Sequence, residues 1–159
     1  MSIDKLKEMG FNLIPLKPKS KEPIGGLNWK QFQDNKYMGS YPDSCNVAVI
    51  CGTSSGNIFV VDLDDATLYD DYPEEIKNTF TVKTGKGYHI YYHFHGFPPP
   101  NKKLDDKRGR HIDIKSHGGY VLAPTSVHPN GSIYTAINES PIMDISIQKL
   151  KDHLSNMGF

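Results

Sequence analysis

Short apolar runs separated by Gly, Pro and charged residues dominate the chain. This pattern predicts strands joined by turns rather than long helices. Strands are expected at residues 11–16, 46–51, 58–62, 80–83, 88–94, 111–115, 120–123 and 132–137. Helical spacing of apolar residues is confined to residues 1–9, 29–33, 66–78 and 144–156. Pro73 is expected to break the third of these helices, because proline interrupts helical hydrogen bonding.

The order of these elements places a sheet-rich centre between helical ends, which predicts an α+β fold. A boundary near Asn57 is expected within the single domain. Residues 1–57 would form an N-terminal α/β module, residues 58–143 a catalytic sheet and residues 144–159 a C-terminal helix. Residues 98–110 are expected to form a polar loop, and residues 84–87 the turn of a hairpin.

Composition narrows the possible classes of protein. A length of 159 residues fits one domain, and 37% hydrophobic with 23% charged residues is ordinary for a soluble globular protein. No apolar run approaches the roughly 18 residues of a membrane span, and no signal-peptide pattern is present. Cys45 and Cys51 lack the spacing of a disulfide framework or a four-cysteine zinc site. We therefore expect a cytoplasmic protein with no membrane partner.

The net charge of zero, from 18 basic and 18 acidic residues, lacks the basic excess that usually accompanies strong nonspecific nucleic-acid binding. Any contact with DNA would therefore be local. Basic residues cluster at residues 17–21 and 102–110. Each cluster is either a solvated loop or a DNA contact, and the sequence leaves both open.

The clearest chemical signal is a buried strand that ends in Asp62-Leu63-Asp64. Because alternate residues of a strand share a face, the two carboxylates lie on the same side, about 6.6 Å apart along the strand. Neighbouring carboxylates repel each other unless a cation neutralises them, so a divalent-metal site that handles phosphates is one interpretation. A solvated strand end, or a helix start capped by Asp65, is the other.

A second candidate group surrounds His89, which follows the turn at residues 84–87. Glycine lets backbone N–H groups approach an anion closely, and Lys86 adds a positive charge beside them. The turn does not match a Walker A loop. Ordinary hairpin chemistry also explains it.

A third carboxylate, Asp113, lies in the segment HIDIK. If Ile112 and Ile114 face the core, Asp113 and Lys115 share the opposite face. Hard divalent cations need several oxygen ligands, and Lys115 would suit a phosphate. A surface position on a strand is the alternative for Asp113.

Other residues with metal-binding or reactive side chains carry less weight. His93 and His95 form an HxH pair on one strand face, but no thiolate lies nearby and we expect no structural zinc. Ser116 and His117 are adjacent in sequence without a GxSxG motif, which argues against a serine hydrolase. Trp29 is expected to anchor the core rather than to stack on a base.

Three segments resemble, in their order, the successive motifs of the primase-polymerase domains of the archaeo-eukaryotic primase superfamily: IFVVDLDD, VKTGKGYHIYY and HIDIKSHGGYVLAPTSVHPNGSIY. They are similar in particular to the bifunctional primase/polymerase N-terminal domains of plasmid, phage and mobile-element replication proteins. Upstream, FNLIPLKPKSKEPIGGLNWKQF resembles the opening segment of that family. The resemblance extends over roughly residues 11–137.

The resemblance implies a role for each matching residue. Asp62, Asp64 and Asp113 match the three metal-binding acids. His89 matches the histidine that contacts the phosphates of the incoming nucleotide, and Lys115 matches a basic position after the third acid. The other expected nucleotide contacts are Thr84, Gly85, Lys86, Gly87 and His128.

One position departs from the family pattern. Where relatives often carry Ser-x-His, this chain has Gly87-Tyr88-His89, which removes a hydroxyl. Backbone contacts from residues 85–87 would have to replace it. The implied fold is a palm-like sheet related to the RNA-recognition motif, packed against an N-terminal α/β module.

The implied activity is template-directed synthesis and extension of primers from NTPs or dNTPs, with two Mg²⁺ or Mn²⁺ ions. The implied partners are a single-stranded DNA template, a primer and the nucleotide, in plasmid or phage replication. Because no P-loop is present, a helicase or strong DNA-binding module would lie outside this segment, in cis or in trans. Two alternatives remain: a catalytically idle replication-initiation module that binds nucleotide or DNA, and a metal-dependent phosphodiesterase that uses the same carboxylates.

Overall fold

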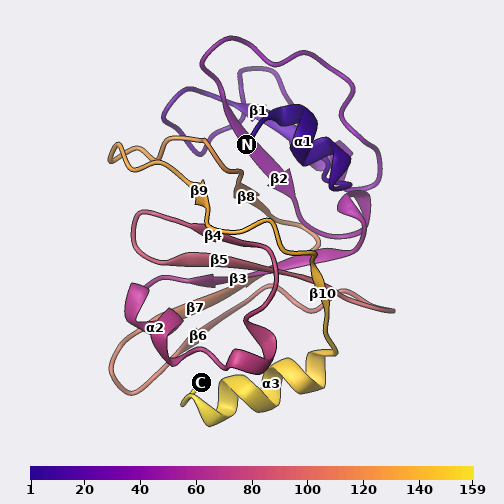
Figure 1. Ribbon diagram of the computed structural model, residues 1–159. Helices are drawn as coiled ribbons and strands as arrows, with labels where there is room; N and C mark the ends of the chain where they lie inside the picture. Colours follow the sequence, from indigo (N-terminus) through magenta and orange to yellow (C-terminus); the bar gives the residue numbers. More distant parts are fainter.

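The structure, a computed structural model, describes all of residues 1–159 (Figure 1). Its strands are β1 (Leu13–Leu16), β2 (Asn46–Ile50), β3 (Ile58–Leu63), β4 (Thr81–Lys83), β5 (Tyr88–His93), β6 (Lys102–Asp105), β7 (His111–Lys115), β8 (Tyr120–Leu122), β9 (Thr135–Ala136) and β10 (Met143–Asp144). Its helices are α1 (Ile3–Glu8), α2 (Ala66–Asp71) and α3 (Ile147–Asn156), with 3₁₀ turns at Trp29–Gln33, Thr53–Ser55 and Glu74–Ile76.

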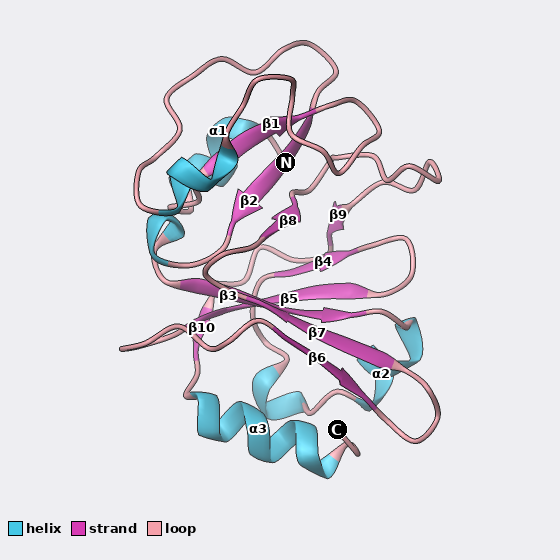
Figure 2. Ribbon diagram, turned by 180° about the vertical axis from the view of Figure 1, so that it is seen from behind, coloured by secondary structure: helices cyan, strands magenta, loops and turns pink.

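The strands form two sheets that lie one above the other (Figures 1 and 2). The smaller sheet has three strands in the order β1-β2-β8. The larger has seven strands, in the order β6-β7-β3-β5-β4-β9, with β10 paired to β5. Helices α2 and α3 lie on the side of the larger sheet away from the smaller one (Figure 2). The predicted α+β fold is confirmed.

The central strand β3 is buried on both faces, and its alternate side chains pack into two different cores. Val60 packs with β1, β2 and β8 in the core between the two sheets. Phe59 and Val61 pack with residues of α2 and α3 in the core on the other side. Burial on both faces explains the uninterrupted apolar run that ends at Asp62.

Helix α2 is shorter than predicted, and its boundaries have local causes. Asp65 is the N-cap, and its Oδ1 accepts a hydrogen bond from the Thr67 backbone N–H at 2.8 Å. The helix ends at Asp71, and a 3₁₀ turn at Glu74–Ile76 follows Pro73. The predicted break at Pro73 is therefore confirmed, and a continuous helix over residues 66–78 is not formed.

The last helix begins later than expected. Asp144 belongs to β10, opposite His93 in the parallel register with β5. Helix α3 starts only after Ser146, whose hydroxyl accepts from the Lys149 backbone N–H at 3.1 Å. Leu150 and Leu154 are buried on the inner face of the helix.

The expected polar loop at residues 98–110 contains a strand, and this part of the prediction was wrong. Strand β6 pairs antiparallel with β7 at the edge of the larger sheet. Its sequence KKLD has one apolar residue, Leu104, so it lacks the alternation that identifies a half-buried strand. Edge strands often carry charged residues, because charge prevents pairing with another sheet.

The boundary expected near Asn57 does not separate the two sheets. Strand β8 pairs with β2, with Leu122 opposite Ala48, so the chain returns to complete the smaller sheet. The strands predicted at residues 111–115 and 120–123 thus belong to different sheets. The strand expected at residues 132–137 shortens to Thr135–Ala136. None of the helices has the length and apolar character needed to span a bilayer.

Candidate active site

A row of polar residues crosses the larger sheet on the face toward the smaller sheet. Lys103 of β6 is opposite Asp113 of β7 in the antiparallel register. Asp113 is in turn opposite Asp62 of β3, and Asp62 is opposite His89 of β5. Directly opposed residues share a face and have Cβ atoms about 4.5–5.5 Å apart. The β6–β7 hairpin, β3 and β5 are separate segments of the chain, and they therefore meet at one place on the sheet.

A polar cavity of about 360 Å³ lies over this row. Its lining includes the three acids that were predicted to bind metal, Asp62, Asp64 and Asp113. It also includes most of the predicted nucleotide contacts, namely Thr84, Gly85, Lys86, His89, Lys115 and His128. Among the predicted site residues, Gly87 alone is not in the lining.

The smaller sheet supplies one wall of the cavity, which the pattern of the sequence does not predict. Strand β8, Tyr120–Leu122, lines it together with Tyr134 and Lys21. The Tyr120 hydroxyl donates to the Lys21 carbonyl at 2.7 Å, which holds the loop after β1 over the cavity. Lys21 belongs to a basic cluster visible in the sequence. Its role depends on the return of the chain to the smaller sheet, which local patterning does not reveal.

Trp29 supports the same wall from behind. Its ring contacts the Tyr120 ring edge-on, with centroids 4.9 Å apart and planes at 80°. Trp29 is partly buried against the core between the sheets. The expectation that it anchors the core is confirmed.

The pKa of Asp62 reflects both its burial and its basic neighbours. Burial by itself would raise its pKa. The hydrogen bond and charge of His89, followed by the charges of Lys115 and Lys21, outweigh burial and hold the pKa of Asp62 below its ordinary value. His89 Nε2 lies 3.5 Å from Asp62 Oδ1. Asp62 is therefore a carboxylate at neutral pH.

His89 lines the cavity but is almost fully buried. The residue is 6% exposed, and its Nδ1 is buried without a hydrogen-bond partner. Its ring lies against Tyr134, with centroids 5.8 Å apart. The Nε2 atom, directed at Asp62, is therefore the part of the imidazole that can take part in chemistry.

The turn at residues 84–87 is closed by its own hydrogen bonds. The Thr84 N–H donates to the Gly87 carbonyl at 2.9 Å, and the Gly87 N–H donates to Thr84 Oγ1 at 3.0 Å. The Gly87 N–H is therefore satisfied within the turn, and an anion contact through Gly87 stays a prediction. The N–H groups of Gly85 and Lys86 have no acceptor in the protein and remain available.

Packing explains why position 87 is glycine. A Cβ atom there would lie 1.8 Å from the Leu63 carbonyl oxygen, which is backbone and cannot rotate away. The departure from Ser-x-His thus reflects the close approach of this turn to the end of β3.

The carboxylates of the cavity suit a hard divalent cation. Asp62, Asp64 and Asp113 offer only oxygen ligands, and no cysteine lines the cavity. The structure has no ready-made group of three or more His, Cys, Asp or Glu side chains placed to hold a metal ion. Asp64 follows the end of β3 and is exposed. Such a lining would fit an open site, in which waters and oxygen atoms of a ligand would complete the coordination of a hard cation.

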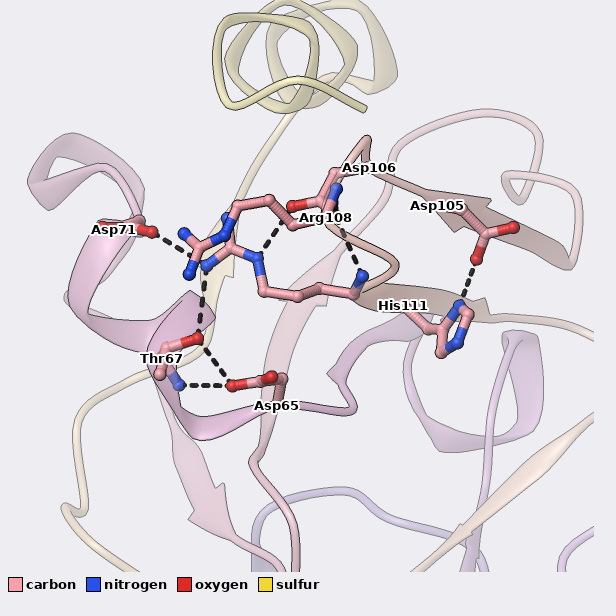
Figure 3. Close-up of polar contacts among 8 residues, drawn as sticks. Asp65, Thr67, Asp71, Asp105, Asp106, Arg108 and His111 are labelled. Carbon is pink, nitrogen blue, oxygen red and sulfur yellow. Dashed lines mark hydrogen bonds and ion pairs between the residues drawn. The ribbon is translucent and has the colours of Figure 1, made fainter.

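A polar network holds the turn between β6 and β7 against α2 (Figure 3). Arg110 donates through Nε to Asp106 at 2.7 Å, and through Nη1 to Asp71 at 3.0 Å and to Thr67 at 3.2 Å. Asp65 accepts from Thr67 and completes the network. The side chains of Arg110 and Asp106 are 10% and 5% exposed. The network therefore fixes the end of β3 relative to the hairpin that carries the third acid.

His111 is a further basic group beside the acids that the sequence analysis left without a role. Its imidazole pairs with Asp105 (Figure 3), and this contact raises the pKa of His111, with smaller effects from the charges of Asp64 and Asp113. The two histidines considered for zinc have separate partners. His93 Nδ1 lies 2.9 Å from the Gly56 carbonyl oxygen, and His95 Nε2 lies 3.3 Å from Asp144 Oδ1.

Comparison with known proteins identifies the family to which the chain belongs. The family model described as bifunctional DNA primase/polymerase, N-terminal, matches residues 4–150. A search of curated proteins found no match. The matched range contains both sheets and every residue that lines the cavity.

Proposed function

Because the chain belongs to the family of bifunctional DNA primase/polymerase N-terminal domains, we propose that it is the catalytic domain of a template-directed primase/polymerase. The family indicates primase/polymerase activity of the nucleotidyltransferase type in general. The finer assignment depends on one observation. Asp62 lies between Asp113 and His89 in a single cross-strand row, within a polar cavity.

The three acids are proposed to hold the catalytic metal. Asp62, Asp64 and Asp113 would hold two Mg²⁺ or Mn²⁺ ions, which would supply positive charge to activate a 3′-hydroxyl and to stabilise the leaving pyrophosphate. The protein contributes position, because paired strands fix two of the three carboxylates. His89 lowers the pKa of Asp62 and lines the cavity in which the phosphates would lie.

Positive groups from three parts of the chain surround the rest of the cavity. Lys21 comes from the loop after β1, Lys86 from the turn before β5, and Lys115 from β7. Together with the free N–H of Gly85, they would neutralise the charge of a triphosphate. This arrangement supports an NTP or dNTP as the substrate.

His128 is proposed to donate a hydrogen bond to the nucleotide. Its Nδ1 accepts from the Asn130 backbone N–H at 3.0 Å. A neutral imidazole in this arrangement carries its proton on Nε2. That proton is available to a sugar or phosphate oxygen in the cavity, which His128 lines.

The proposed partners are a single-stranded DNA template and a primer. The chain has no net charge, so we propose weak, salt-sensitive DNA binding by this domain alone. A helicase or strong DNA-binding module, in cis or in trans, would hold the template during replication.

Primer synthesis and extension on a single-stranded template, with Mg²⁺ or Mn²⁺, tests the proposal. The wild-type protein is expected to lengthen a labelled primer only when nucleotides are supplied, and the double variant Asp62→Asn with Asp64→Asn is expected not to. Asp34→Asn with Asp70→Asn is the matched control, since both residues are exposed and lie outside the cavity. Full activity in the first double variant would refute the site.

The same assay separates the alternatives. Cleavage of the labelled strand without nucleotides would identify a phosphodiesterase. Binding of nucleotide without incorporation would identify an idle binding module, although such a module has no need of three carboxylates in one cavity.

A further inference from the structure

We propose that the β6–β7 hairpin binds the phosphate backbone of the DNA strand that reaches the active site, through Lys102, Lys103 and Lys107. The inference rests on the proposed function for the identity of its partner. It adds a surface outside the nucleotide cavity. We call these three lysines the hairpin lysines.

The hairpin lysines are exposed and form no ion pair. Lys102 and Lys103 lie on β6, at the edge of the larger sheet, and Lys107 lies in the turn that follows. No acidic group lies within ion-pairing distance of their ammonium groups. Their charge is therefore available to a ligand from solution.

Each acidic residue of the same hairpin lies beside a basic partner within it, and for Asp113 this partner is Lys115, at 3.8 Å. Asp105 pairs with His111, and Asp106 pairs with Arg110. The local surface is consequently positive, although the whole chain has no net charge. A polyanion is the partner that fits such a surface.

Lys103 continues the catalytic row, and Lys102 lines the same groove. Lys103 is directly opposite Asp113 across the β6–β7 pair. A shallow groove of about 200 Å³ is lined by Lys102 and Lys103 together with Asp113 and Lys115. The last two residues also line the main cavity. A strand that follows the groove would therefore end at the carboxylates.

The chemistry of the surface favours contact with phosphates over contact with bases. Lysine is a point charge, and the groove has no aromatic residue on which a base could stack. We therefore expect binding without sequence preference. Arg108 is not included, because Figure 3 shows its side chain directed toward α2.

Lysines on an edge strand also prevent sheet-to-sheet pairing. That role alone would give no salt-dependent affinity for DNA. The dependence of affinity on salt therefore distinguishes a DNA-binding surface from a protected edge.

Anisotropy titrations of a labelled single-stranded oligonucleotide, at several salt concentrations and without metal or nucleotide, test the inference. Replacing the three hairpin lysines with glutamine should lower the slope of log K against log[salt] by about 2, at roughly 0.7 per phosphate contact on a single strand. Between 50 and 200 mM salt, the wild type should then lose roughly 20-fold more affinity than the variant.

The control variant carries Lys5→Gln, Lys149→Gln and Lys151→Gln, which remove the same charge from exposed positions on α1 and α3. It should keep the wild-type slope. Replacing the hairpin lysines with arginine should also keep the slope, and melting curves would show that each variant is folded. An unchanged slope in the glutamine variant, or an equal loss in the control, would overturn the inference.

This test does not depend on catalysis. A wild-type protein that binds DNA with the expected salt dependence but incorporates no nucleotide would disprove the proposed function and leave the inference standing. A protein that incorporates nucleotides while the glutamine variant keeps the full slope would disprove the inference alone.

Discussion

Asp62 and Asp113 face each other as direct partners on adjacent antiparallel strands. Like charges in this position destabilise a sheet. The protein offsets the repulsion locally, with His89 Nε2 at 3.5 Å from Asp62 and Lys115 Nζ at 3.8 Å from Asp113. A costly pair of like charges that is held in place by basic neighbours is typical of a functional site.

Asp113→Asn should separate stability from activity. The amide keeps the shape of the side chain and removes one of two opposed charges, so the free energy of unfolding should be unchanged or rise by up to about 1 kcal/mol. Nucleotide incorporation should fall about 10³-fold, because loss of a metal ligand removes several kcal/mol of transition-state stabilisation. Thermal melting and steady-state kinetics measure the two effects. Activity within tenfold of the wild type would contradict the assignment.

Lys21→Met should weaken nucleotide binding. The loop after β1 holds the Lys21 ammonium at the wall of the cavity, where it would face the triphosphate. We expect KM for the nucleotide to rise about tenfold, since a charge-assisted hydrogen bond contributes roughly 1.5–3 kcal/mol. Lys19→Met in the same loop is the control, as Lys19 is exposed and outside the cavity. Equal KM values for both variants would show that Lys21 does not contact the substrate.

His89→Gln should raise the pKa of Asp62. In the wild type that pKa is lowered, so ionised Asp62 stabilises the fold above the ordinary aspartate pKa, and this contribution is lost as pH falls through the folded-state value. Without the imidazole, the burial that raises the pKa is opposed only by the lysines. Carbon NMR of the metal-free carboxyl groups measures the change. Asp65, whose pKa is lowered by hydrogen bonds from Thr67, serves as the internal reference and should not move.

Gly87→Ala should destabilise the protein by roughly 2 kcal/mol, the usual scale for forcing an atom into a packed site. The new Cβ would approach the Leu63 carbonyl oxygen to 1.8 Å unless the turn moves. At this chain length the melting temperature should fall by several degrees. Gly25→Ala is the control, since nothing lies within 4 Å of a Cβ at that position. A melting temperature equal to that of the Gly25 variant would show that the turn moves to accept the Cβ without loss of stability.

Local patterning was enough to single out the candidate acids, Lys115 and the turn at residues 84–87. The side-chain period of a strand predicted that Asp62 and Asp64 share one face, and that Asp113 and Lys115 share the face opposite Ile112 and Ile114. The side-chain period of a strand is two, so any paired register preserves these faces. The turn at residues 84–87 was also visible, because glycine and lysine in a short connection between two strands form a recognisable pattern.

Only the tertiary structure decided which faces meet and what covers them. The register that places Asp62 between Asp113 and His89 depends on pairing between strands far apart in sequence. The return of β8 to the smaller sheet brings Tyr120 and Lys21 over the acids, and no local pattern marks that pairing. Long-range pairing is set by the hydrogen bonds and packing of the whole sheet, whereas periodicity reports only the two faces of each strand. The acids and the turn of the candidate site could thus be predicted from the sequence. The wall that Tyr120 and Lys21 add over them could not.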